Sequence, residues 1–237
     1  MRSRVSENAA EPPLRAVDAD VWVAEAPLRY VVEVGRRMTV VRLGDGGIWI
    51  HSPLELSPAL GNALDALGRA RFITAASPLH GHLALGDYPL RYPDAELLAP
   101  PGLAAKRPEL TFGAGELGDQ ADARWVAELD QAVFRGHRLL EEVIFLHRAS
   151  GSLIVGDTCF NITPSAPVLT RLWAWGPRMR QRAGPALPFR LGVRDRRAAR
   201  ASIDRILAWD FDRVIVGHGE IIESGGHAAF AEAWAWL

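Results

Sequence analysis

Residues 134–161 read FRGHRLLEEVIFLHRASGSLIVGDTCFN, and this stretch decides the fold. The apolar runs 142–147 and 152–156 predict two strands, and the Ser and Gly residues between them predict a turn. Asp157 follows the second strand directly, where an unpaired buried charge would be costly. We therefore expect either a bound cation or a turn cap at Asp157, and the sequence alone leaves both interpretations open.

The composition indicates a globular protein. The chain has 237 residues, of which 49% are hydrophobic and 23% charged, enough for one sizeable core. Its formal net charge of -1 and the lack of a long apolar run predict neither a nucleic acid nor a membrane as partner. A small-molecule substrate is a separate expectation. No signal-peptide pattern precedes Pro13, and Cys159 is the single cysteine, so we expect a cytoplasmic location. A homodimer is a further expectation.

The first half of the chain changes from a β pattern to a βα pattern. Short strands are predicted across 21–50, including one at 28–34, followed by a helix that Ser57 caps. The strand 71–76 then delivers the loop 77–82, SPLHGH, at its carboxyl end. Ligand-binding residues favour such strand ends.

The expected organisation is a flexible leader, residues 1–17, and one domain, residues 18–237. Within this domain, the Trp-rich and Pro-rich segment 162–193 cannot continue a sheet and is predicted to form a helical lid over the strand ends. Asp195 can cap the helix that follows, and a last strand ends at Gly217.

Side chains of the kind that bind metals follow the predicted strands. They are His80, His82, His137, Asp157 and His218. Neutral imidazole and carboxylate groups suit zinc, iron or manganese. A lone His is more often a core or surface residue than a ligand, so only the combination supports a metal site.

In this order the residues resemble the metallo-β-lactamase superfamily, and the resemblance runs from about Val21 onward. The sequence GDTCF at 156–160 is similar to the family's bridging-Asp motif, and VGHG at 216–219 is similar to its last His motif. Gly136 and His137 are similar to the lone-His motif. The resemblance implies an α/β fold, the αββα four-layer sandwich.

The departures lie in the first half. The family's loop motif is His-x-His-x-Asp-His, whereas this chain has SPLHGH at 77–82. If His82 is the motif's final His, His80 has no assigned place. His51 also stands where the family usually has Asp. The chain looks most like the uncharacterised DUF4336 branch, in which this motif is reduced.

The resemblance implies a metal-dependent hydrolase of an ester, lactone, thioester, amide or phosphoester, with one or two zinc ions, or iron or manganese instead. Asp157 would be the catalytic residue, and His82, Asp157 and His218 the core of the site, with His80 or His137 completing it. The alternatives are a non-catalytic binding protein with a degenerate site and an iron-dependent redox protein. The roles of His51, Glu142 and His147 stay open.

Overall fold

Two β-sheets form the inner layers of the protein. The computed structural model describes residues 14–113, 115–176 and 183–237. The first sheet has the order β1-β2-β3-β4-β5-β6. Its strands are β1 (Arg15–Asp18), β2 (Val21–Ala26), β3 (Arg36–Arg42), β4 (Ile48–His51), β5 (Ala70–Thr74) and β6 (Glu96–Leu98). Neighbours are antiparallel from β1 to β4 and parallel from β4 to β6, which matches the predicted change of pattern.

The second sheet has the order β11-β9-β8-β7. It consists of β7 (Leu129–Phe134), β8 (Glu142–His147), β9 (Ser152–Ile154) and β11 (Arg213–Ile215). The predicted central hairpin is confirmed, because β8 and β9 are antiparallel with Phe145 opposite Ile154. A separate parallel pair joins β10 (Phe160–Asn161) to β12 (His218–Gly219) beyond the ends of β9 and β11.

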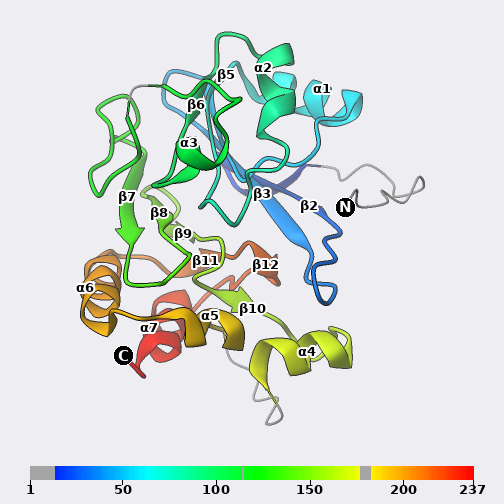
Figure 1. Cartoon of the computed structure of the whole chain (residues 1–237). Coiled ribbons are helices and arrows are strands. Elements are labelled where there is room, and N and C mark those ends of the chain that lie inside the picture. Colours follow the sequence, from blue (N-terminus) through cyan, green and yellow to red (C-terminus); the bar gives the residue numbers. More distant parts are fainter. Residues whose placement is uncertain (1–13, 114, 177–182) are drawn as a thin grey trace.

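Helices cover the outer face of each sheet (Figure 1). On the first sheet lie α1 (Pro58–Leu67), η1 (Leu85–Asp87), α2 (Tyr88–Arg91) and α3 (Leu103–Lys106). On the second lie α6 (Arg196–Leu207) and α7 (Gly226–Trp234), while α4 (Val168–Trp175) and α5 (Leu187–Gly192) lie beside β10. The predicted caps are present, since the side chains of Ser57 and Asp195 accept from Leu60 N and Ala198 N.

Side-chain alternation explains why four layers form. In β4, Ile50 points into the core beneath α1 and α2, and Trp49 points between the sheets. In β8, Ile144 faces α6 and Phe145 faces the first sheet. Strands that are apolar on both faces must be covered on both faces. The fold is therefore the predicted αββα sandwich.

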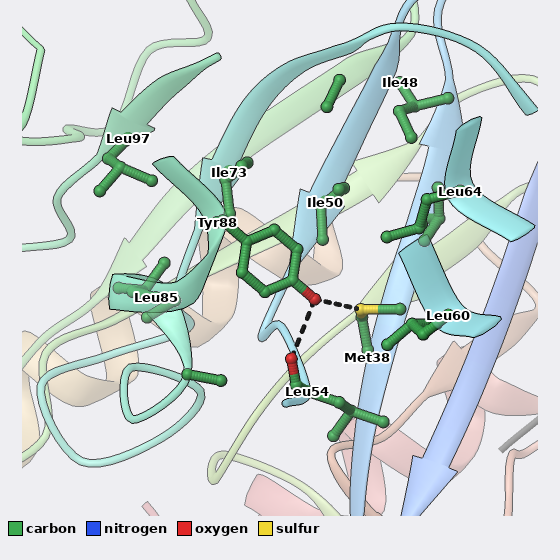
Figure 2. Packing of buried hydrophobic residues seen from close by; sticks show 14 of the residues in the cluster. Met38, Ile48, Ile50, Leu54, Leu60, Leu64, Ile73, Leu85, Tyr88 and Leu97 are labelled. Atoms are coloured by element: carbon green, nitrogen blue, oxygen red, sulfur yellow. Dashed lines mark hydrogen bonds between the residues drawn. The ribbon is translucent and has the colours of Figure 1, made fainter. Parts of the chain in front are cut away.

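The core under α1 and α2 contains one polar group that is fully satisfied (Figure 2). The Tyr88 hydroxyl donates to the carbonyl oxygen of Leu54 at 3.0 Å and lies 3.5 Å from Met38 Sδ. This bond fixes the chain just after β4. It thereby helps to place the loop that begins beyond His51.

Several predicted boundaries differ from the structure. Residues 1–13 of the expected leader lie outside the described residues, but Arg15–Asp18 is an edge strand, because Ala16 pairs with Trp22 of β2. The strand expected at 28–34 is a loop instead, held by Glu33, whose carboxylate accepts from Leu28 N and Gly35 N. In the described part of 162–193 the regular elements are helices, and the lid role of that segment stays a prediction.

Among the described residues, no helix is long and apolar enough to cross a membrane.

Candidate metal centre

Three elements deliver a cluster of ligand-type side chains. His80 lies in the loop after β5, Asp157 follows β9, and His218 begins β12. One ligand atom from each of these residues lies within 4.8 Å of the others, and all three side chains are buried. Among the residues that the structure describes, these three alone form a group of His, Cys, Asp and Glu side chains that could hold one ion.

Glycines before the ligands allow this close approach. A Cβ on Gly217 would lie 3.0 Å from two ring atoms of His80 and 3.1 Å from Gly156 Cα. A Cβ on Gly156 would lie 2.7 Å from Ala76 Cβ. The glycines in the GD and GH motifs therefore leave room for the His80 ring and for the two ligand turns to pack together.

The orientation of His218 is fixed from two sides. Its Nδ1 lies 2.6 Å from the carbonyl oxygen of Gly35, and Phe160 stacks on its ring with centroids 4.7 Å apart. A carbonyl only accepts hydrogen bonds, so we assign the proton to Nδ1. The other nitrogen, Nε2, then faces Asp157 Oδ1 at 3.2 Å.

This geometry provides a test of whether a cation fits. Burial acts to raise the pKa of Asp157, but the hydrogen bond with His218 and the charges of the neighbouring histidines outweigh it, so the pKa is lowered. That hydrogen bond requires a proton on Nε2, and when His218 carries only its Nδ1 proton, the Nε2 lone pair and the ionised carboxylate are two acceptors that repel at 3.2 Å. A second proton on His218 or a metal ion resolves the conflict, so the donor set fits a divalent metal.

His80 completes the set as a neutral ligand. Its Nδ1 lies 3.8 Å from Asp157 Oδ1, and its ring stands edge-on to His218. Burial lowers the pKa of His80 to about 4, and positive charge on the neighbouring His218 ring, whenever it is protonated, acts in the same direction. The imidazole is therefore neutral near neutral pH, with a proton on one ring nitrogen and a lone pair for an ion on the other.

His82 lies elsewhere, although it was expected in the core of the site. Its Nε2 is 3.3 Å from Lys106 Nζ and its Nδ1 is 3.3 Å from an amino nitrogen of Arg107. Burial and these two positive charges lower the pKa of His82 to about 4. The structure gives the place in the ligand group to His80, because the α3 region holds the His82 ring.

His137 is also outside the ligand group. Its Nδ1 accepts from Leu139 N at 3.1 Å and Leu140 N at 2.9 Å, so the proton resides on Nε2. That nitrogen is buried and has no hydrogen-bond partner among the described residues. In this tautomer His137 offers no lone pair to an ion.

The structure shows what surrounds His51, Glu142 and His147, whose roles the sequence left open. His147 contacts the Ser150 hydroxyl at 2.7 Å in the β8–β9 turn, away from the ligands. His51 packs against Trp49 and Phe145 between the sheets, and burial, with a smaller effect of His80, lowers its pKa to about 3. Glu142 is fully buried beneath Asp157, and burial, followed by the Asp157 charge, raises its pKa to about 7.

Two hollows border the ligand group. One, of about 620 Å³, is lined by residues on both sides of His218, including Gly35, Gly217 and Gly219. The other includes His80 and Leu79 in its wall. Both share Arg36 and Arg37, a buried arginine in β3 that sequence reasoning missed. The sequence signal for it is that Arg37 is a charged residue on the same face of the strand as Val41, the face that packs between the sheets.

Solved structures with the same fold include metallo-β-lactamases. A metallo-β-lactamase from Pontibacter korlensis matches with a TM-score of 0.65 at 11% identity, over 95% of this chain and 98% of its own. DIM-1 metallo-β-lactamase matches with a TM-score of 0.62 at 14% identity, over 95% and 96%. The metal-soaked Flv1 flavodiiron core from Synechocystis sp. PCC6803 matches with a TM-score of 0.65 at 8% identity, over 97% of this chain and 61% of its own.

The sequence comparisons give a narrower assignment. No curated protein matches the chain. The profile of the family described as Domain of unknown function (DUF4336) matches residues 19–186, which is more than half of the chain. The chain therefore belongs to the DUF4336 family, and its fold is that of the metallo-β-lactamases.

Proposed function

We propose that this protein is a metal-dependent hydrolase of a small molecule carrying an ester, lactone, thioester, amide or phosphoester bond. One observation carries the proposal, namely the buried ligand atoms of His80, Asp157 and His218 within 4.8 Å of one another. Buried ionised groups need a partner, and the acceptor atoms that face each other here fit a cation best.

A single ion is the stoichiometry that the donor set favours. Two imidazoles and one carboxylate form a three-ligand set, and three protein ligands leave a position for water in a catalytic site. Zinc is our first choice, and iron or manganese suit the same donors. A second ion would require donors beyond His82, whose ring nitrogens face Lys106 and Arg107, and His137, whose Nδ1 accepts from backbone N–H groups.

The chain's own groups have separable roles in this proposal. Asp157 supplies the negative charge, and His80 and His218 supply neutral nitrogens. A bound ion of this kind supplies an acidified water and a Lewis acid for the scissile bond. The hollow of about 620 Å³ is in the size range of small-molecule sites and is lined by Gly217 and Gly219, the two neighbours of His218, which supports it as the side from which a substrate would approach.

A cytoplasmic location and a homodimer belong to the same proposal. The net charge of -1 favours a small-molecule substrate over nucleic acid. Sedimentation of the purified protein measures the oligomeric state, and fractionation of expressing cells measures the location.

The test is hydrolysis by one protein preparation, first stripped by a chelator and then reloaded with zinc, iron or manganese. The substrate panel contains one chromogenic member of each of the five bond classes. We expect turnover of at least one class that disappears on stripping and returns with one metal. Metal binding without any turnover would favour the binding protein, and redox cycling of bound iron would favour the redox protein.

A further inference from the structure

Two buried side chains, one acidic and one basic, form hydrogen bonds to the backbone around Asp157 and His218. Glu142, at the start of β8, is 0% exposed. Its carboxylate accepts from the backbone N–H groups of Gly156, Asp157 and Thr158, at 2.7, 2.6 and 3.0 Å, and from the Thr158 hydroxyl at 2.7 Å. Each of these donors belongs to the turn Gly156–Thr158, which presents Asp157.

Arg37, in β3, makes the matching contacts at the other turn. Its guanidinium donates to the carbonyl oxygen of Val216, and to that of Gly219 at 2.6 Å. These carbonyls stand on either side of His218. Glu25 pairs with the same guanidinium at 2.9 Å, so the charge of Arg37 is compensated.

The signs of the two charges follow from the backbone groups that need partners. The backbone N–H groups of the turn Gly156–Thr158 point inward, and one carboxylate can accept hydrogen bonds from several of them at once. The His218 turn turns carbonyl oxygens inward, and the planar guanidinium reaches two acceptors in a fixed geometry. A fixed turn orients its side chain, so these contacts determine where Asp157 Oδ1 and His218 Nε2 point.

Burying a charge is costly unless it is fully hydrogen-bonded. The Glu142 carboxylate accepts hydrogen bonds from the Asp157 turn, and the Arg37 guanidinium donates two hydrogen bonds to the His218 turn. An apolar pair would fill the same space without this cost. The presence of these two polar side chains, where apolar ones would pack, therefore indicates that the orientation of the two turns matters more than packing.

We propose that Glu142 and Arg37 are positioning residues, which hold Asp157 and His218 in the geometry that lets them share one ion with His80. This inference rests on the proposed function for its purpose. Its structural content, the orientation of the two turns, can be tested without a metal.

The first test is titration of stripped protein with Co²⁺, which reports both affinity and coordination geometry through its absorption spectrum. The variants are Glu142→Gln, which keeps the size of the side chain, and Arg37→Met, which keeps the length of its stem. We expect each to weaken Co²⁺ binding about 10- to 100-fold and to change the visible spectrum. Wild-type affinity and spectrum in folded protein would overturn the proposal.

A control separates positioning from stability. Ile203 is a fully buried residue of α6, in the cluster that packs against the second sheet. Ile203→Ala should lower the unfolding temperature while leaving the Co²⁺ spectrum unchanged. All titrations are made well below the unfolding temperature of the least stable variant, so an equal spectral change in the Ile203→Ala protein would also refute the role.

The second test works on stripped protein and decides the matter even if the wild type takes up no Co²⁺, an outcome that would refute only the proposed function. Hydrogen exchange measured by NMR follows two protons: the imidazole N–H that His218 donates to Gly35, and the backbone N–H of Asp157. We expect at least tenfold faster exchange of the first in Arg37→Met and of the second in Glu142→Gln, with neither changed in Ile203→Ala. Unchanged exchange in both variants would overturn the inference.

Discussion

The loop after β5 and the turn after β9 each position one side chain of the candidate metal centre, but different contacts hold them in place. The turn Gly156–Thr158 is gripped by one buried carboxylate through four hydrogen bonds. The loop 77–82 is held by separate contacts instead: the Ser77 hydroxyl accepts from Leu79 N and His80 N at 3.1 Å each, and the side chains of Lys106 and Arg107 donate to the carbonyl oxygens of Pro78 and His82. The first half of the molecule supplies one member of the His80, Asp157 and His218 cluster, and the second half supplies two. The candidate site therefore depends more on the contacts of the second half.

The largest expected difference is between alanine substitutions of the two histidines of the loop, His80 and His82. His80→Ala should weaken metal binding at least about 100-fold, because loss of a ligand exceeds the 10- to 100-fold loss typical of its supporting groups. His82→Ala should change affinity by less than about threefold, since its ring faces Lys106 and Arg107. Calorimetric zinc titration of both variants measures the contrast.

Each variant is the control for the other, because both side chains are buried and both substitutions remove the same imidazole group. If His82→Ala lost more affinity than His80→Ala, the family register would describe the site better than the structure does.

Acid should destabilise the first half through His51. Its pKa is lowered to about 3 in the folded protein by burial, against about 6.5 in the unfolded chain. The unfolded state takes up the proton first, so this stabilising contribution is complete above about pH 6.5 and is lost as the pH falls toward 3. One such group contributes a slope of about 1.4 kcal/mol per pH unit in that window.

Urea unfolding of stripped protein between pH 6.5 and 4 measures the slope. His51→Phe retains a ring against Trp49 and Phe145 and cannot take up the proton, so the slope should fall by about 1.4 kcal/mol per pH unit. An unchanged slope would mean that His51 is protonated equally in both states.

The smallest effect is expected at Ser77. Ser77→Ala removes one acceptor from two backbone N–H groups and should lower the free energy of unfolding by about 1 kcal/mol. Its metal affinity should fall by less than tenfold, because the His80 ring also packs edge-on against the His218 ring and close to the Gly217 backbone. A loss larger than that of Glu142→Gln, in parallel zinc titrations, would place the tighter control in the first half.

The sequence predicts the layers because alternation and turn residues are local signals. The runs 142–147 and 152–156 contain the hairpin, and Ser57 and Asp195 cap their helices as expected. The segment 28–34 has strand-type residues but forms a loop, since its backbone is captured by the Glu33 side chain. That capture depends on where β2 ends, which local patterns do not determine.

The site was predictable where a ligand follows a glycine at a strand end, as at Asp157 and His218. The choice between His80 and His82 was not. Gly81 between them has a φ of +78° and lies so close to Ser52 that an added Cβ would be 2.4 Å from the Ser52 hydroxyl oxygen. Which ring then faces Asp157 depends on Lys106 and Arg107, more than twenty residues away in the sequence. Long-range contacts of this kind leave no periodic signal.

The most direct test of the metal centre is the metal content of purified protein, measured for the wild type and for Asp157→Ala after identical dialysis. The three-ligand geometry predicts about one zinc, iron or manganese ion per wild-type chain and almost none in the variant, because the anionic ligand is gone. A wild-type protein without metal would mean that a second proton on His218 satisfies Asp157. Equal metal content in both proteins would place the ion elsewhere and contradict the site.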